Sequence, residues 1–417
     1  MEYEVASYSI NPEDAVRCIP PDPLLCENGR RVDTAKGWEA HRRPELLSLL
    51  ERECYGVPLP PPDELNIREF SRKDDALGGL ATRKEWEICC RMRNGRSFSF
   101  VMLVYLPNHA KGPVPAFLGL NFKGNHNTTT EDDVLKTGYV REGELAVPER
   151  GVQAYRWCFE EVVRRGYASA TICYHDIHPD RTHETGRSCF SLFFDEAEYP
   201  FIRRTHSVIG AWAWGLSRGL DALEREPAID ASRVAVHGHS RLGKTSLWAG
   251  AVDQRFAMVI SNDSGCGGAA LHKRKFGENL SQHFEAHEKQ GVPFWFLEGM
   301  RRYIWHEETL PFDQHELLAM AAPRPLCVAS ASDDFYADPE GEFLACHYAS
   351  PVYELYGFPP FADEKGMPRM IAPGEHCPGR LHYHYRKGVH DQTEFDWKHY
   401  LEQADRFLGP NLSHDVR

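Results

Sequence analysis

One serine stands where the backbone could expose its hydroxyl for nucleophilic attack. Ser240 follows a short β-branched segment, residues 234–237, and precedes an apolar, helix-forming segment, residues 242–252. A serine in a sharp turn between a strand and a helix is held at the edge of a sheet with its hydroxyl pointing outward. Gly238 and Gly243 leave room for the turn and for close contact between helix and strand.

This turn departs from the usual G-x-S-x-G pattern, because the second glycine comes three residues after the serine. Arg241 directly follows Ser240, and Lys244 lies one helical turn further on. A cation at the first position of a helix is unfavourable beside the positive end of the dipole, so Arg241 calls for an anionic partner. We expect Lys244 to line the same cleft. The alternative interpretation is that Arg241 and Lys244 are ordinary helical residues whose charges are exposed to water.

A serine hydroxyl needs a histidine base and a carboxylate that orients the base. His390 lies in the loop before the last predicted helix, where such folds carry the base. Three aspartates are candidates for the acid. Asp334 follows a late predicted strand, Asp263 follows the strand after the serine helix, and Asp338 precedes Pro339 and is better suited to cap the next helix. Each could instead be an ordinary turn residue.

Apolar periodicity predicts alternating strands and helices along most of the chain. The predicted strands are residues 85–93, 97–106, 114–121, 167–174, 234–237, 256–261, 325–331 and 369–371. The predicted helices are residues 38–55, 152–165, 205–225, 242–252, 340–355 and 394–408. This alternation is typical of a doubly wound, mostly parallel sheet between two helical layers, an α/β/α sandwich of the α/β-hydrolase type.

We expect residues 1–35 to form an N-terminal arm and residues 36–417 to form a single catalytic domain. Polar, turn-rich stretches interrupt that domain at about residues 122–150, 175–203 and 265–320, and we interpret them as lid-like insertions.

Several motifs resemble those of the glucuronoyl esterases of carbohydrate esterase family fifteen, in their bacterial form. They are Gly238-His-Ser240-Arg-Leu-Gly-Lys244, Ser261-Asn-Asp263-Ser-Gly-Cys-Gly-Gly, Phe117-Leu-Gly-Leu-Asn121-Phe-Lys-Gly-Asn125-His, Ala322-Pro-Arg-Pro-Leu, Ala337-Asp-Pro-Glu-Gly-Glu-Phe and Gly388-Val-His390-Asp. The resemblance covers about residues 38–408, and the G-x-S-R-x-G-K signature is specific.

The resemblance implies that Ser240 is the nucleophile and His390 the base. It implies that Arg241 stabilises the oxyanion and that Lys244 holds the uronate sugar. The family's acid has two positions, one matching Asp263 and the other lying near Asp334 or Asp338, so the assignment stays open.

Three further residues are candidates for contact with a sugar. Trp295 lies in Phe294-Trp-Phe296, which resembles the family's tryptophan-bearing segment, although a core aromatic cluster is an equal alternative. Phe335 neighbours Asp334, and Glu278 lies in a segment similar to the family's.

The composition limits the classes of molecule that the protein is expected to bind. The formal net charge of −13 argues against nucleic acids and anionic membranes, and no apolar run is long enough to span a bilayer. The first residues lack a signal-peptide pattern, so we expect a cytoplasmic protein as given, or a secreted or periplasmic one if a leader was removed. The twelve cysteines are scattered without C-x-x-C, which is typical of free thiols. We expect a monomer.

The segment from Glu375 to His384 is rich in histidine, and its H-x-H spacing places two rings on one strand face. No fourth ligand is evident at a suitable spacing, so we expect core or surface histidines and no metal or other cofactor.

The sequence thus predicts a serine esterase. By the resemblance, its substrate is the ester between (4-O-methyl-)glucuronic acid on xylan and an alcohol of lignin. An acetyl-xylan or general carboxylesterase is the alternative among enzymes, and a non-catalytic carbohydrate-binding relative is the alternative from another class.

Overall fold

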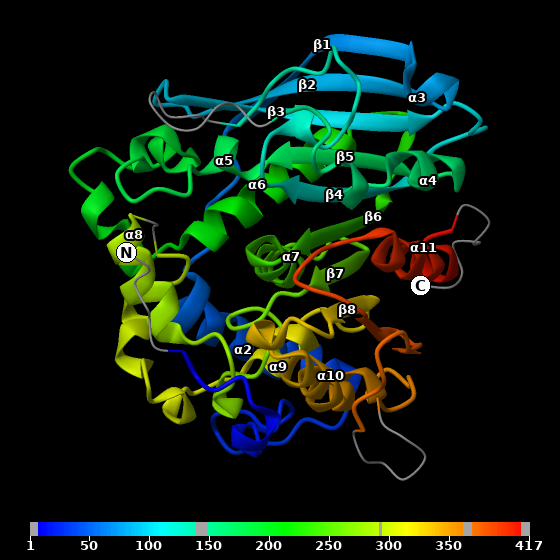
Figure 1. Cartoon of the computed structure of the whole chain (residues 1–417). Helices are drawn as coiled ribbons and strands as arrows, with labels where there is room; N and C mark the ends of the chain where they lie inside the picture. Colours follow the sequence, from blue (N-terminus) through cyan, green and yellow to red (C-terminus); the bar gives the residue numbers. More distant parts are fainter. Residues whose placement is uncertain (1–6, 139–148, 292–293, 362–368, 410–417) are drawn as a thin grey trace.

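A ten-stranded sheet forms the centre of the computed structural model, which describes residues 7–138, 149–291, 294–361 and 369–409. The strands are β1 Glu64–Asp75, β2 Ala81–Arg91, β3 Ser97–Pro107, β4 Val114–Asn121, β5 Ala168–Cys173, β6 Ile229–His239, β7 Met258–Asn262, β8 Leu326–Ala331, β9 His376–Cys377 and β10 Leu381–Arg386. They lie in the order β1-β2-β3-β5-β4-β6-β7-β8-β10-β9, and the labelled strands can be followed from β1 to β8 in Figure 1.

The sheet has an antiparallel end and a parallel middle. Strands β1, β2, β3 and β5 pair antiparallel, whereas β5, β4, β6, β7, β8 and β10 are parallel neighbours. Parallel strands need crossover connections, and these bring the loops after their carboxyl ends to one edge of the sheet. The loops after β6, β7, β8 and β10 carry every residue predicted for the catalytic triad.

Helices of very different length connect the strands. The helices are α1 Ala35–Gly37, α2 Arg43–Leu50, α3 Ala76–Gly79, α4 Phe159–Arg164, α5 Tyr174–Ile177, α6 Val208–Leu223, α7 Arg241–Val252, α8 His287–Gln290, α9 Gln314–Ala319, α10 Pro339–Glu354 and α11 Glu394–Phe407. Two π-helical turns, Trp38–Arg42 and Glu51–Tyr55, extend α2 at both ends and make up the helix predicted at residues 38–55.

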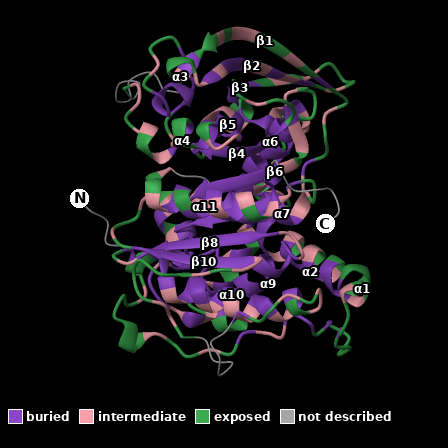
Figure 2. Cartoon of the chain, turned by 90° about the vertical axis from the view of Figure 1, so that its right-hand side faces the viewer, coloured by how far each residue is buried: buried purple, intermediate pink, exposed green. Residues whose placement is uncertain are grey.

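The helices cover both faces of the sheet, as the fold class requires. Helices α4 and α11 pack on one face against side chains such as Phe117 and Cys327, whereas α2, α6, α7, α9 and α10 pack on the other against Leu118 and Val236. Neighbouring residues of β4 serve opposite layers because strand side chains alternate between faces. Figure 2 shows the central strands almost wholly buried and β1, at the edge, largely exposed. The predicted three-layer sandwich is confirmed.

Two predictions of strands need correction. The last strand is not at residues 369–371, where the described residues carry no strand, but at β10, residues 381–386, all six of which are buried. The sequence of β10 is polar, and its histidines obscured the strand. Strand β1 was missed because an edge strand with one buried residue lacks an apolar pattern. The predicted helix at residues 152–165 shortens to α4, preceded by one 3₁₀ turn.

Part of the N-terminal arm packs against the third insertion. The N–H groups of Tyr8 and Val16 donate to the carbonyls of Gly277 and Arg274, so the arm runs along the insertion that begins at residue 265. That insertion consists mainly of short 3₁₀ turns with α8 and α9. Residues 139–148 of the first insertion and residues 1–6 of the arm lie outside the described residues.

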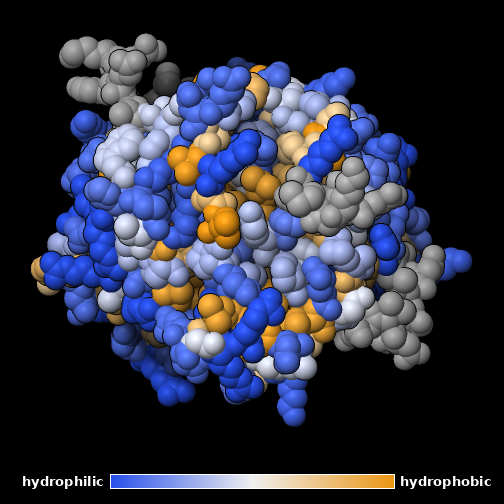
Figure 3. Space-filling model, turned by 90° about the horizontal axis from the view of Figure 1, so that it is seen from below, coloured by the Kyte–Doolittle hydropathy of each residue, from blue (hydrophilic) through white to orange (hydrophobic). Residues whose placement is uncertain are grey.

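The surface seen from below is mostly hydrophilic, and its hydrophobic side chains form small separated groups (Figure 3). None of the helices in the described part of the chain is long and apolar enough to cross a membrane.

Candidate active site

The backbone at Ser240 is held in a rarely used conformation. Strand β6 ends at His239 and α7 begins at Arg241, which leaves Ser240 between them with φ 58° and ψ −129°. Such a conformation costs energy and persists where surrounding contacts enforce it. The Ser240 N–H donates to the Asn262 carbonyl at 2.8 Å, and the Ser240 carbonyl accepts from the N–H groups of Gly243 and Lys244. The serine therefore sits on a strained turn fixed on both sides.

The two glycines of the turn are required by close packing. A Cβ atom on Gly238 would lie 2.0 Å from the Leu242 carbonyl oxygen, far inside van der Waals contact. A Cβ on Gly243 would lie 3.0 Å from Cβ of Ser264. The predicted role of both glycines, which is to let α7 approach the sheet, is confirmed.

His390 forms a short hydrogen bond with Asp334. The His390 Nδ1 atom is 2.6 Å from Oδ2 of Asp334, whose side chain is 7 % exposed, whereas that of His390 is 43 % exposed. The loops that carry them are joined, since the Asp333 N–H donates to the Gly388 carbonyl and the Gly388 N–H to Oγ of Ser332. A carboxylate bound to Nδ1 orients the ring and leaves Nε2 to act as a base.

The His390 ring lies next to the serine turn. Its centroid is 4.5 Å from that of His239, the residue directly before Ser240. Nδ1 of His239 is 2.6 Å from Oδ1 of Asn262, and burial lowers the pKa of His239 well below its usual range. His239 is therefore a neutral spacer between the sheet and the base.

Asp263, the second candidate acid, is buried nearby and has other partners. Its Oδ2 accepts from Nη2 of Arg386 at 3.3 Å and from the Asp391 N–H at 3.4 Å. One side-chain nitrogen or oxygen atom from each of Asp263, Asp334 and His390 lies within 4.8 Å of the other two, yet His390 forms its hydrogen bond with Asp334. Burial, together with the neighbouring Asp334, raises the pKa of Asp263 well above its usual range. Because His390 bonds to Asp334 while Asp263 bonds to Arg386 and the Asp391 backbone, the geometry favours Asp334 as the acid.

Asp338, the third candidate, is a helix cap. Its side chain accepts from the Gly341 N–H at the start of α10 and pairs with Nε of Arg274 at 3.0 Å. The capping interpretation from the sequence is confirmed.

Glu342 is a structural carboxylate that the sequence did not reveal. Its Oε1 accepts from the N–H groups of Ser264 and Gly265, and its Oε2 accepts from Oγ of Ser330 at 2.5 Å. Burial raises the pKa of Glu342 to about 7. Glu342 ties the loop after β7 to the end of β8, and these two segments carry Asp263 and Asp334.

Arg241 has the anionic partner that its position demanded. Its Nη1 atom is 2.6 Å from Oδ2 of Asp180, a buried carboxylate whose Oδ1 accepts from Nε1 of Trp295 at 3.0 Å. The Arg241 guanidinium also lies over the Trp295 ring, 4.5 Å from its centroid. Tyr174 donates to the same carboxylate at 3.3 Å. Asp180 thus fixes Arg241 and Trp295 together, and sequence reasoning missed it because it lies in an irregular insertion.

Lys244 and Glu278 form a second pair on the same wall. The Lys244 side chain is 3 % exposed, and its Nζ donates to Oε2 of Glu278 at 3.0 Å while lying 5.7 Å from the Trp295 ring centroid. His283 adds a nitrogen 3.6 Å from the Glu278 carboxylate. The structure therefore brings Arg241, Lys244, Glu278 and Trp295 into one cluster beside the nucleophile turn.

The two aromatic candidates differ in exposure. Trp295 is 5 % exposed, and its ring packs against the side chains of Arg241 and Lys244. It is therefore both a buried aromatic residue and a part of the site. Phe335 is 42 % exposed and directly follows Asp334. Phe335 is therefore accessible to a bound ligand, whereas Trp295 is buried.

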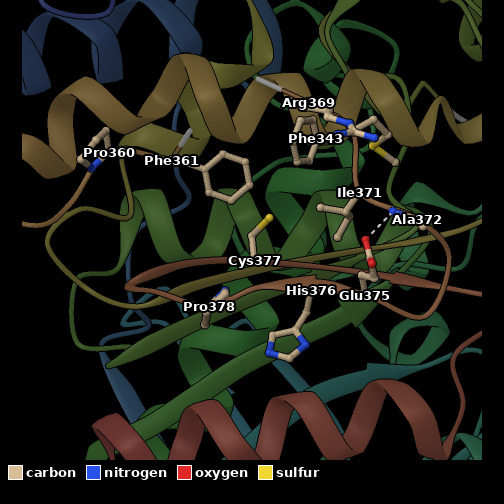
Figure 4. A pocket seen from close by; sticks show the side chains of 11 residues that line it. Phe343, Pro360, Phe361, Arg369, Ile371, Ala372, Glu375, His376, Cys377 and Pro378 are labelled. Carbon is tan, nitrogen blue, oxygen red and sulfur yellow. Dashed lines mark hydrogen bonds between the residues drawn. The ribbon is translucent and has the colours of Figure 1, made fainter. Parts of the chain in front are cut away.

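A cavity of about 630 Å³ lies elsewhere, next to α10 and β9. Phe343, Phe361, Ile371, His376 and Cys377 are among its lining residues, drawn in Figure 4. None of the predicted catalytic residues is among its described lining residues. The chemistry therefore places the candidate active site at Ser240.

Comparison with known proteins identifies related esterases. A model of fungal glucuronyl esterases matches residues 165–357. A carbohydrate esterase of an unknown prokaryotic organism is 40 % identical over 93 % of this chain and 89 % of its own length. The 4-O-methyl-glucuronoyl methylesterase 1 of Wolfiporia cocos is 36 % identical over 82 % of this chain and 73 % of its own length.

Solved structures give the same result. A glucuronoyl esterase from Solibacter usitatus superposes with a TM-score of 0.84 at 37 % identity, covering 95 % of this chain and 99 % of that one. A promiscuous CE15 esterase from a marine bacterial metagenome superposes with a TM-score of 0.83 at 37 % identity, covering 96 % and 100 %. The chain belongs to the CE15 family of glucuronoyl esterases.

Proposed function

We propose that this protein is a serine esterase that hydrolyses esters of glucuronic acid and of its 4-O-methyl derivative. One observation carries the proposal. A strained nucleophile turn, an Asp334–His390 pair beside it and two cations, the half-buried Arg241 and the buried Lys244, meet at the first turn of α7. The methylesterase name of the Wolfiporia cocos relative supports the same substrate class.

The reaction begins with attack of Ser240 Oγ on the ester carbonyl while Nε2 of His390 takes the hydroxyl proton. The carbonyl oxygen becomes an oxyanion. The Arg241 N–H, in the first turn of α7 where no helical carbonyl precedes it, and the guanidinium can both donate to that oxygen. Collapse of this intermediate returns the proton from His390 to the departing alcohol and leaves a glucuronoyl ester on Ser240.

Water completes the cycle. His390 takes a proton from water, the hydroxide attacks the acyl-enzyme carbonyl, and the same oxyanion contacts act again. Ser240 leaves with the proton from His390, and the uronic acid is released. Asp334 accepts the Nδ1–H throughout and stabilises the imidazolium that forms twice in each turnover.

The Lys244–Glu278 pair supplies a donor and an acceptor for sugar hydroxyls. A pyranose offers hydroxyls that both donate and accept, and a buried charged pair can bind two adjacent hydroxyls at once. Lys244 lies one helical turn from Ser240, which supports a role for the pair in binding the sugar on the acyl side of the scissile bond. Glucuronoxylan-derived esters and lignin–carbohydrate esters are the proposed natural substrates.

The test is a comparison of Ser240→Ala with the wild-type protein on methyl and benzyl glucuronates. We expect the variant to lose hydrolysis by about 10⁴-fold or more with an unchanged melting temperature. Retained activity in a folded Ser240→Ala protein contradicts the assignment of the nucleophile, and failure of a serine-reactive phosphonate to label the wild type supports the non-catalytic alternative.

A second candidate function has one observation in its favour. The similar marine metagenomic protein is described as a promiscuous CE15 esterase. A broad carboxylesterase would hydrolyse acetyl-xylan and simple acetyl esters as fast as glucuronate esters. Measuring kcat/KM for both substrate classes on one preparation distinguishes the two functions.

A further inference from the structure

Four histidines and one cysteine gather on the face of the sheet that α11 covers. His382 and His384 lie on β10, Cys327 pairs in register with His382 from β8, His376 lies opposite His384 on β9, and His399 belongs to α11. Neighbouring rings in this group have centroids 4.5 Å apart for His384 and His399, 4.9 Å for His376 and His399, and 5.5 Å for His382 and His384. The cluster plays no part in the proposed esterase chemistry.

The donor atoms of three of these residues converge. One donor atom each from Cys327, His382 and His384 lies within 4.8 Å of the other two, and the Cys327 Sγ is 3.8 Å from Nδ1 of His384. In a tetrahedral zinc site, Zn–S and Zn–N bonds of usual length place sulfur and nitrogen about 3.6 Å apart. The observed spacing is therefore close to that of a formed site.

A carboxylate already orients one of these rings as in metal proteins. Nε2 of His384 is 2.9 Å from Oδ1 of Asp396, and Oδ2 of Asp396 pairs with Nε of Arg386 at 3.0 Å. Ligating histidines almost always donate their second N–H to a carboxylate or carbonyl, which leaves the other nitrogen free to bind the metal. Here that nitrogen is Nδ1, which faces Cys327.

His382 supplies a buried nitrogen that lacks a partner. Its side chain is 1 % exposed, and neither ring nitrogen has a hydrogen-bond partner among the described residues. A buried imidazole with no charged partner is favoured in its neutral form, which offers a lone pair to a metal. A buried polar group without a partner is unfavourable, and a metal bond would satisfy it.

We propose that Cys327, His382 and His384 bind one borderline-soft divalent ion of the zinc type, with the fourth position open beside His399. A thiolate and two neutral imidazoles are ligands that favour zinc or cobalt over magnesium or calcium, which take oxygen ligands. The thiol gives up its proton to solvent when the metal binds. The sequence reasoning that found too few ligands missed Cys327, which lies 57 residues before His384.

His376 gives this site a connection to solvent. It is exposed, and Figure 4 shows its ring on the side toward α11, whereas Cys377 and Phe361 lie on the other side of the strand. Its centroid is 5.6 Å from that of His382. An exposed imidazole at the rim provides an entry path for an ion to an otherwise buried site.

A metal at this site would stabilise the loop that carries His390. Asp396 joins His384 to Arg386, and the Nη2 group of Arg386 donates to the carbonyls of Val389 and Asp391, on either side of His390. A metal bound to His384 would therefore fix the segment from which the base is presented, without touching the substrate.

The experiment measures metal binding by the whole, tag-free protein after treatment with EDTA. We expect one equivalent of Zn²⁺ to bind in calorimetric titration and to raise the melting temperature. We also expect Co²⁺ to give the near-ultraviolet band of a thiolate-to-cobalt charge transfer, because Cys327 is a ligand. Cys327→Ser should abolish the band, and His382→Gln should weaken Zn²⁺ binding about 100-fold. Cys90→Ser, a buried cysteine of β2 at the other end of the sheet, is the matched control and should leave both unchanged.

Two results would overturn the proposal. One is a wild-type protein that takes up no stoichiometric Zn²⁺, and the other is bound Co²⁺ without a thiolate band. The cobalt spectrum needs only the wild-type protein, so the test stands even where a variant fails to fold. None of these measurements depends on esterase activity.

Discussion

His390 and Asp334 are joined by a hydrogen bond of 2.6 Å, although they reach the active site from the ends of different strands, β10 and β8. Asp263 lies within 4.8 Å of both donor atoms but bonds instead to Arg386 and to the Asp391 backbone. The two carboxylates therefore have separate tasks. Asp334 orients the base, and Asp263 holds the loop on which the base sits.

Replacing Asp334 with asparagine tests this division. Asp334→Asn removes the carboxylate that accepts Nδ1–H, so the wrong tautomer of His390 is stabilised, and kcat should fall by about 10³–10⁴. Asp263→Asn keeps the hydrogen-bonding shape and should lower kcat by about 10-fold or less. Steady-state kinetics on methyl glucuronate, with melting temperatures to verify folding, measure both. A larger loss in Asp263→Asn than in Asp334→Asn would reverse the assignment.

Asp180→Asn tests the support of the oxyanion contact. The change removes the charge that pairs with Arg241 at 2.6 Å and accepts from Trp295, so the guanidinium loses its fixed position. Loss of one well-placed oxyanion donor costs about 10²–10³ in kcat, and a misplaced donor should cost a part of that, about 10–100-fold. The loss should appear in kcat more than in KM, because the oxyanion forms only in the transition state.

Asp230→Asn is the matched control for Asp180→Asn. Asp230 pairs with Arg233 near the start of β6, at the opposite end of that strand from the serine turn, and its removal should leave kcat unchanged. Equal effects of the two changes would mean that Asp180 acts only on general stability.

The serine turn and the base were predictable because local rules determine both. The turn requires glycine where the backbone of α7 and the loop after β7 come close, and Gly238 and Gly243 therefore indicate the turn in the sequence. The base of such a fold follows the last strand, so the position of His390 beside the serine turn could be predicted from its place in the chain. The acid was not predictable, because Asp263 and Asp334 both follow strand ends and differ only in their tertiary partners.

The missed features share a physical cause. Asp180 lies in an irregular insertion, where no periodicity indicates which side chains face inward. Strand β10 reads as polar, yet all six of its residues are buried, because its histidines pack against neighbouring rings and His384 pairs with Asp396. Strand β1 reads as a loop because the sheet edge leaves it solvated. Tertiary contacts overrode local pattern in each case.

Lys244→Gln tests the sugar contact. The side chain keeps a donor of similar length but loses the charge that pairs with Glu278 at 3.0 Å. A hydrogen bond from a charged group contributes about 1.5–3 kcal/mol, so kcat/KM on methyl glucuronate should fall by about 10–100-fold. Hydrolysis of a small acetyl ester, which has no sugar on the acyl side, should change by less than about 3-fold. The ratio of the two rates is the measurement, and an unchanged ratio would favour the broad carboxylesterase.

Gly238→Ala should damage the turn through packing alone. The new Cβ would lie 2.0 Å from the Leu242 carbonyl oxygen, which belongs to the backbone of α7 and cannot move without the helix. Overpacking of this kind costs about 3 kcal/mol, and the melting temperature should fall by several degrees together with activity. Gly112→Ala is the matched control, because a Cβ there meets no atom within 4 Å among the described residues. Thermal unfolding that shows equal stability of the two variants would contradict the close contact.

His237→Leu tests how buried histidines set the response to acid. Burial lowers the pKa of His237 to about 3, and neither ring nitrogen has a hydrogen-bond partner in the described part of the chain. The unfolded chain binds a proton at this residue below about pH 6.5, whereas the folded protein does not. The contribution of neutral His237 to stability is therefore complete above pH 6.5 and is lost as the pH falls toward 3.

Between pH 6.5 and 5.0 this single residue should lower the free energy of unfolding by about 2 kcal/mol, since each pH unit contributes about 1.4 kcal/mol. His237→Leu cannot be protonated, so its stability should fall less over that range than the wild type does, whatever its stability at pH 7.5. His41→Leu replaces an exposed histidine and should follow the wild-type curve. Denaturant unfolding at several pH values gives the slopes, and a wild-type slope in His237→Leu would show that the folded protein accommodates the proton at His237.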